Sequence, residues 1–221
     1  GSGGITESVV VGGDGGTLGT TVSARYAAED FALSLHVPFA SYRVDDKRRT
    51  NLGNLRAEGF WRMASDRAIT QVGLELHLPT GSAWTWTNDA VSFWRSGGIT
   101  GVFQRRQMMT DSADLVLRGA LGVHATPGFD PVPRVYPHVS MAVGVDHELH
   151  ERFGYTTEVA FSAWDPSPFD LGAWAKAEPV RGLQLRLGGI LPVGTWLGAS
   201  PTRKPVGVRE VTISGSISVA P

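Results

Sequence analysis

Residues 31–40, FALSLHVPFA, decide the fold because apolar side chains alternate along them with small or polar ones. The apolar positions are Phe31, Leu33, Leu35, Val37 and Phe39. A β-strand places successive side chains on opposite sides of the sheet, whereas a helix repeats every 3.6 residues. The segment therefore predicts a strand that is apolar on one side only.

The same period of two recurs along the whole chain and predicts twelve strands. Their ranges are 5–12, 17–27, 31–42, 52–63, 69–79, 91–104, 113–125, 134–147, 153–164, 169–178, 182–193 and 206–219. The ranges 5–12 and 91–104 follow the pattern least closely, and without them ten strands would remain. No stretch approaches the 18 or so consecutive apolar residues of a membrane-spanning helix, so we expect an all-β fold.

Strand length and mid-strand charge favour a membrane barrel over a soluble sheet. Most of the predicted strands run for about 10 to 14 residues, whereas strands of soluble proteins usually have about 5 or 6. A tilted strand needs about 9–11 residues to cross the hydrocarbon core. The sequence thus predicts a closed antiparallel up-and-down transmembrane β-barrel over residues 5–221, a single domain, with residues 1–4 as a terminal extension or tag. The alternative is a soluble sandwich, whose leucine and valine rows would meet in a dry centre.

The polar sides of the predicted strands supply the candidate lumen-lining residues. They are Arg25, His36, Arg56, Glu58, Glu75, His77, Arg118, His124, His138, Glu158, Lys176 and Arg186. Charges of both signs in a water-filled lumen imply little ionic selectivity. The same charges could instead pair with one another and close the lumen, because a narrow barrel can be filled by large inward side chains.

The connections between the predicted strands are long at one end of the barrel and short at the other. With a periplasmic N-terminus, the long connections 43–51, 80–90 and 194–205 would be extracellular, as in bacterial outer-membrane barrels. The predicted periplasmic turns are 28–30, 64–68, 105–112, 148–152 and 179–181. Pro38 and Pro137 lie inside predicted strands and indicate bulges.

Composition excludes several other classes of function. The chain has 20 basic and 21 acidic residues and a net charge of −1, so it lacks the basic excess of a nucleic-acid-binding protein. It has no cysteine, so disulfides and thiolate metal sites are ruled out. The glycine-rich segment 11–16, VGGDGG, lacks the Lys-Ser/Thr of a phosphate-binding loop and predicts a tight hairpin. No charged and apolar leader opens the chain, so we expect a mature chain without its signal peptide.

Three short motifs add a family resemblance over residues 31–104. They are the VPF strand end at 37–39, the Gly-Asn-Leu strand start at 53–55 and the LPTG strand end at 78–81. Their order resembles the family of outer-membrane channels named for the phenol-degradation pathway, which are regarded as relatives of hydrophobic-compound transporters. The resemblance implies a barrel that passes small, aromatic or hydrophobic molecules. The chain departs from the common aromatic C-terminus of such barrels, because it ends in Val219-Ala220-Pro221.

Two further patterns could carry chemistry. His138 and Ser140 are two residues apart and so share one side of a strand, with Glu148 and Glu158 as candidate carboxylates for nucleophilic hydrolysis. Their side is the lumen side, whereas a lipid hydrolase must face the membrane. Histidines on four predicted strands could bind a metal only if the fold brought them together. A hydrogen-bonded lumen histidine is the simpler interpretation, so we expect neither an enzyme nor a cofactor or metal.

The favoured hypothesis is an outer-membrane channel for passive diffusion of small solutes in a Gram-negative bacterium, with aromatic or hydrophobic molecules as the class that the resemblance implies. The alternatives are a structural or assembly barrel with a plugged lumen and, behind it, an outer-membrane hydrolase. The expected partners are outer-membrane lipid, lipopolysaccharide and small-molecule solutes. Residues 45–49, Asp-Asp-Lys-Arg-Arg, predict a mixed-charge loop that either contacts lipopolysaccharide phosphates or is merely hydrophilic.

Overall fold

The structure of the protein is a computed structural model of the 221-residue chain. It describes residues 2–11, 17–44, 47–81, 97–125, 135–162, 169–193 and 211–219. Within these ranges, no helix is both long and apolar enough to cross a membrane.

The described residues form thirteen strands. They are β1 (Ser2–Val11), β2 (Thr17–Ala27), β3 (Phe31–Val44), β4 (Lys47–Leu52), β5 (Leu55–Ser65), β6 (Ala68–Leu78), β7 (Gly97–Thr110), β8 (Ala113–Ala125), β9 (Val135–His150), β10 (Phe153–Ser162), β11 (Phe169–Val180), β12 (Leu183–Val193) and β13 (Val211–Val219). Both of the less regular segments of the sequence, at 5–12 and 91–104, contribute strands, namely β1 and β7.

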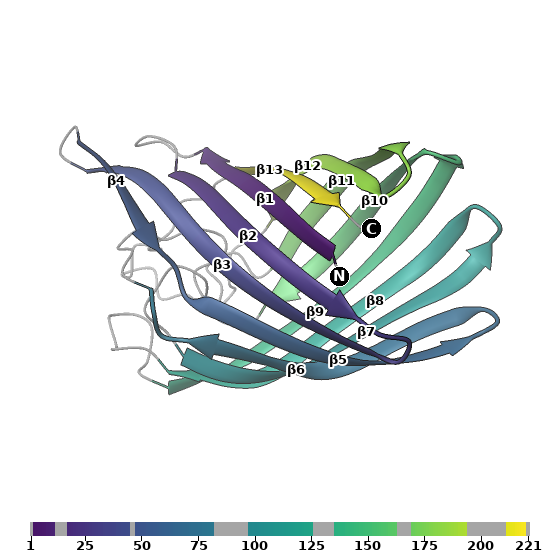
Figure 1. The fold of residues 1–221 in the computed structure, drawn as a ribbon, viewed down its shortest axis with the longest axis horizontal. Coiled ribbons are helices and arrows are strands. Elements are labelled where there is room, and N and C mark those ends of the chain that lie inside the picture. The colour runs from purple at the N-terminus through teal and green to yellow at the C-terminus, as the bar shows by residue number, and fades with distance from the viewer. Residues whose placement is uncertain are drawn as a thin grey trace.

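The strands pair into one continuous antiparallel ring. Each strand from β5 to β13 pairs with the next in sequence, β1 pairs with β13, and β2 joins β1 to β3. β3 then pairs with β5 and completes the circuit, while the short β4 pairs with β3 as an extension of the wall. Figure 1 shows the strands tilted around a common interior, with the two termini close together. Twelve strands therefore make the wall, as the sequence predicts.

The outer face of this wall is apolar and the interior is polar. On β8, for example, Leu121 is 68% exposed, whereas His124 is 1% exposed. Among the described residues the buried hydrophobic ones are only Ala32 and Val116, while five polar residues are buried, namely Asn54, His77, Thr100, His124 and Thr156. A soluble domain buries its leucines and valines instead. The apolar rows do not meet in a dry centre, so the sandwich alternative is wrong.

Tight turns connect the strands at one end of the barrel, and backbone hydrogen bonds link neighbouring hairpins there. The carbonyl of Asp30 accepts from the N–H of Arg62 at 2.8 Å, and that of Arg67 accepts from Met108 at 2.8 Å. The carbonyls of Ser112 and Arg152 accept in the same way from the next hairpins along. In the turn at 181–182, Gly182 has a φ of 82°, a conformation that favours glycine. We call this rim the turn end.

Two predicted connections are wrong in the structure. Residues 105–110, placed in a turn by the sequence, belong to β7, which continues to Thr110 and turns only at 111–112. Most of residues 43–51, predicted as a loop, extend β3 to Val44 and form β4, although residues 45–46 lie outside the described ranges. The connections 80–90 and 194–205 and the hairpin at 11–16 fall largely or wholly outside those ranges as well.

Each of the two strand prolines lies in an unbroken register with one neighbouring strand. Between the pairs His36↔Arg56 and Phe39↔Leu52, two residues of β3 oppose three residues of the partner chain segment, which is a one-residue bulge beside Pro38. The extra residue lies in the partner segment 53–55 and not in β3, whose register with β2 runs without a shift through the Thr21↔Pro38 pair, and β9 likewise shows no shift against β8 at the Pro137↔Val123 pair.

The bulge is held by the three motifs that carry the family resemblance. The carbonyl of Pro38 accepts from the N–H of Gly53 at 2.7 Å. The buried Asn54 side chain accepts from the N–H of Gly81 at 2.8 Å. The hydroxyl of Thr80 donates to the carbonyl of Gly53 and accepts from the N–H of Leu55, both at 2.9 Å. Segments 37–39, 53–55 and 78–81 thus form a single hydrogen-bonded junction in the wall.

Candidate functional site

A chain of polar contacts begins on the inner face of β2 and crosses to β6. Nδ1 of His36 lies 2.7 Å from Oγ of Ser23, and its Nε2 lies 3.3 Å from Oε2 of Glu58. Nε of Arg56 lies 3.0 Å from Oε1 of Glu58 and 3.7 Å from Oε2 of Glu75. Two carboxylates therefore share one guanidinium in the barrel interior.

The contacts continue through three histidines on β6, β8 and β9. Glu75 also contacts Nε2 of His77. The ring of His77 lies 4.8 Å from that of His124, which lies 5.0 Å from that of His138. Thr100 on β7 places its hydroxyl 2.9 Å from Nε2 of His124. We call the whole set the histidine belt; its members are Ser23, His36, Arg56, Glu58, Glu75, His77, Thr100, His124 and His138.

Glycine makes room for the belt at its most crowded point. A Cβ on Gly98 would lie 2.6 Å from the carbonyl of Val123 and 2.7 Å from Cγ of His124. The imidazole of His124 can therefore cross β7 only because the neighbouring residue there has no side chain. In the described part of the chain, no group of three or more histidine or acidic side chains is arranged to hold a metal ion. The rings of His77, His124 and His138 pack against one another instead.

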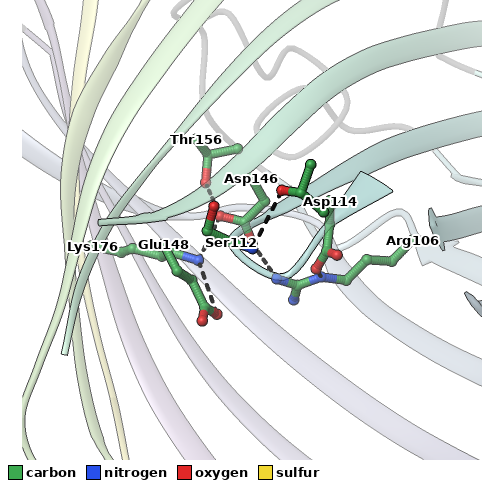
Figure 2. Close-up of polar contacts among 8 residues, drawn as sticks. Arg106, Ser112, Asp114, Asp146, Glu148, Thr156 and Lys176 are labelled. Carbon is green, nitrogen blue, oxygen red and sulfur yellow. Dashed lines mark hydrogen bonds and ion pairs between the residues drawn. The ribbon is translucent and has the colours of Figure 1, made fainter. Parts of the chain in front are cut away.

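A second polar group, the Asp146 cluster, lies nearer the turn end (Figure 2). Asp146 on β9 accepts from Nη2 of Arg106 at 2.6 Å, and its other oxygen lies 2.5 Å from Nζ of Lys176. Thr156 donates its hydroxyl to the same carboxylate at 3.2 Å. Arg106 also contacts Asp114 at 2.5 Å, and Lys176 lies 4.0 Å from Glu148. Both oxygens of Asp146 are thus engaged, each by a cation.

Two further contacts place the remaining predicted charges inside the wall. Nη1 of Arg118 lies 3.0 Å from Oε2 of Glu158. The guanidinium of Arg186 stacks over the ring of Trp174, 4.6 Å from its centroid, which is a cation–π contact. Within the described residues, each of the twelve predicted residues except Arg25 therefore takes part in a side-chain contact.

Arg25 lines a cavity of about 220 Å³ at the rim of the turn end. Arg62, Arg106, Gln71 and Gln104 are its other polar lining residues. Small and apolar residues complete the lining: Ala27, Ala28, Phe31, Ala32 and Ile69.

The structure does not assemble a hydrolytic site around His138 and Ser140. His138 packs against His124, and Ser140 lies opposite Ala120 and Ser162 in the sheet. The two candidate carboxylates are elsewhere, because Glu148 lies by Lys176 at the turn end and Glu158 pairs with Arg118. The His-x-Ser spacing therefore reflects two inward positions of one strand.

Sequence reasoning missed the centre of the Asp146 cluster and most of the cavity. The sequence places Arg106 in the predicted turn 105–112 and gives Asp114 and Asp146 no role beyond polar positions of the strands 113–125 and 134–147. Extending the alternation of β7 past Gln104 would have placed Arg106 on the inner side. Nothing in the sequence indicates that residues 106 and 146 meet, because that contact depends on the register of three strands.

Comparison with known proteins finds the architecture but not a family. No family model and no curated protein matches the chain. Among solved structures, the NanC porin superposes with a TM-score of 0.68 at 8% identity and covers 99% of this chain and 100% of its own. An outer-membrane channel from Pseudomonas putida F1 gives 0.64 at 12% identity, covering 99% and 94%. The KdgM porin in complex with disordered oligogalacturonate gives 0.62 at 11% identity, covering 99% and 98%.

These likenesses extend over nearly the full length of both partners, so they concern the whole barrel. They support the outer-membrane channel class of fold that the sequence predicts, and they do not single out the phenol-degradation-pathway family. The chain has the fold of the outer-membrane porins.

Proposed function

We propose that the protein is an outer-membrane channel for the passive diffusion of small solutes. One observation carries the proposal: the closed ring is apolar outside and polar inside, which is the reverse of a soluble domain. Apolar side chains on the outer face suit lipid, while backbone groups in the closed sheet are hydrogen-bonded strand to strand. The porin-like fold is in keeping with this location.

The resemblance of the three interlocked motifs to the phenol-degradation-pathway channels suggests the finer solute class. Small, aromatic or hydrophobic molecules are the solutes that it implies. Lipid and lipopolysaccharide would surround such a barrel.

Planar-bilayer recording tests the channel proposal. Protein refolded into detergent micelles and added to a bilayer should produce discrete conductance steps, and the same preparation heated until the barrel unfolds should produce none. Steps that persist after heating would come from a contaminant. Silence of the folded protein, with its fold checked by heat-modifiable electrophoretic mobility, would contradict the proposal.

The second candidate, a plugged structural barrel, is favoured by the number of ion pairs inside the wall. The histidine belt and the Asp146 cluster both link side chains from several strands, which is how a narrow lumen is filled. The double variant Arg118→Ala/Glu158→Ala separates the two candidates. An open channel should conduct before the change, and the variant should conduct modestly more. A plugged barrel should not conduct before the change, and only the variant should conduct.

A further inference from the structure

The cavity at the turn end is lined by basic residues and, among the described residues, by no acidic ones. Three guanidinium-bearing residues line it, Arg25, Arg62 and Arg106, and no aspartate or glutamate does. We propose that this cavity binds the carboxylate group of a small organic anion. The inference rests on the proposed channel function only in that a solute would reach the cavity through the lumen.

The charge of the cavity is not neutralised by the protein. Arg106 is paired with Asp114 and Asp146. Within the described residues, by contrast, Arg25 and Arg62 make no ion pair and no side-chain hydrogen bond, even though Glu29 and Asp30 lie in the adjoining turn. Arg25 and Arg62 both line the cavity, so an anion bound there would be attracted by both charges. The site therefore favours a ligand with negative charge.

The neutral side chains favour a carboxylate with a compact apolar body. Gln71 and Gln104 oppose each other on β6 and β7, Gln71 also opposes Arg62 on β5, and both glutamines line the cavity together with the arginines. A guanidinium binds a planar carboxylate through two parallel hydrogen bonds. The apolar part of the ligand would lie against Ile69 and the buried Ala32. A cavity of about 220 Å³ holds a molecule of the size of benzoate.

The strand geometry explains why the cavity is open. Ala27 and Ala32 are paired across β2 and β3, so a stretch of wall between Arg25 and Arg62 carries only methyl groups on its inner side. The backbone N–H of Arg62 donates a hydrogen bond to the carbonyl of Asp30, which fixes the backbone from which the Arg62 side chain extends. The basic groups are thus held apart on rigid strands, which reduces the cost of ordering them around a ligand.

Ligand-observed NMR on the full-length protein in uncharged detergent micelles tests the proposal. Sodium benzoate is the probe, benzyl alcohol is its neutral analogue, and inorganic phosphate is the competing oxyanion. We expect benzoate signals to broaden with the protein, benzyl alcohol signals to stay sharp, and phosphate to displace benzoate poorly. Arg25→Gln/Arg62→Gln should weaken benzoate binding about tenfold or more, because both charge-assisted hydrogen bonds to the carboxylate are lost.

The control removes the same charge from the same end of the barrel. Arg67 and Arg105 are exposed, lie near the turn end and do not line the cavity, so Arg67→Gln/Arg105→Gln should leave benzoate binding unchanged. Equal weakening in both double variants would overturn the proposal, because it would indicate general electrostatic attraction. Equal broadening of benzyl alcohol, or displacement by phosphate at equal concentration, would overturn it too.

Bilayer recording keeps this result separate from the channel proposal. If the protein conducts and benzoate does not bind, the cavity proposal fails alone. If benzoate binds to a barrel that never conducts, the channel proposal fails alone. If both hold, benzoate should reduce the chloride current of the unmodified protein and have little effect on the Arg25→Gln/Arg62→Gln variant.

Discussion

The outer and inner faces of the same strands differ in chemistry: the outer face exposes apolar side chains, and the inner face carries paired charges. On β12, Leu187 is 65% exposed on the outer face, while the neighbouring Arg186 points inward and stacks on Trp174. The outer face has few specific contacts, such as the edge-to-face pair of Phe31 and Trp61 at 5.7 Å. The inner face has ion pairs and hydrogen bonds that reach from strand to strand.

This difference shows where specificity resides in the molecule. In the proposed outer-membrane channel, any apolar side chain of suitable size satisfies an outward position, because lipid chains adapt to it. An inward charge needs a particular partner at a particular place on another strand, since an unpaired polar group away from water is costly. We therefore expect the inner face to respond to small chemical changes and the outer face to respond only to a change of polarity.

The largest effect should come from the centre of the Asp146 cluster. Asp146→Ala leaves Arg106 with one acidic partner and Lys176 with only the 4.0 Å contact to Glu148. Breaking a buried pair from one side costs about 3–5 kcal/mol, and because the side chains of Arg106 and Lys176 are 38% and 28% exposed, we expect a loss at the lower end, about 3 kcal/mol. Denaturant unfolding in lipid vesicles, followed by tryptophan fluorescence, measures it. Asp111→Ala, in an exposed turn of β7–β8, should change nothing; equal losses would show that Asp146 is not a centre of the fold.

A change of polarity on the outer face should come next. Leu121→Arg puts a charge where the side chain is 68% exposed on β8, and such a charge facing lipid costs about 2–4 kcal/mol near the bilayer midplane. Leu149→Arg is the control, because Leu149 is 66% exposed but lies close to the turn end, where the cost falls to about 0–1 kcal/mol. The same vesicle unfolding assay applies. No loss of stability for either variant would mean that water, and not lipid, covers the outer face.

The sequence predicts the outer face well because that face depends on local information. Alternation is a property of one strand at a time, so most of the wall strands and their inward and outward sides follow from period two, while half of β7 does not. The exceptions are also local: Val116 breaks the alternation of its strand in the sequence and is buried on the inner side in the structure.

The inner face is predictable only as a set of positions. Eleven of the twelve predicted inward residues find partners, yet the pairs themselves, such as Arg118 with Glu158, depend on the register of several strands. The three histidines converge because rows of paired residues run obliquely around a tilted barrel, which no single segment encodes. Arg106 was assigned to a turn because the run RRQMM at 105–109 hides the alternation of β7.

Substitutions at two glycines of β7, one on each face of the wall, allow the two faces to be compared on the same strand. Gly98→Ala puts a methyl group 2.6 Å from the carbonyl of Val123 and against the ring of His124, so the backbone and the histidine belt must shift. Such overpacking costs about 1–3 kcal/mol. Gly101→Ala, three residues along, meets only the carbonyl of Leu121 at 3.5 Å and should be neutral or slightly stabilising. Thermal unfolding, read as the loss of heat-modifiable mobility, should rank Gly98→Ala clearly below Gly101→Ala; the reverse order would contradict the packing of His124 over β7.

The smallest effect we expect is in the histidine belt itself, at Glu75→Gln. The amide keeps the shape of the side chain and can still accept a hydrogen bond, but it loses the charge that faces Arg56 and His77. Arg56 retains Glu58 at 3.0 Å, so the loss should be about 1 kcal/mol, with Glu151→Gln in an exposed turn as the unaffected control. A double-mutant cycle of Glu75→Gln with Arg56→Gln measures the interaction energy between these two side chains. This energy should be smaller than the interaction energy between Asp146 and Arg106, because the Glu75–Arg56 contact is 3.7 Å and the Asp146–Arg106 contact is 2.6 Å. If the Glu75 cycle proved the larger, inner-face stability would depend on proximity to the histidines rather than on the closeness of opposite charges.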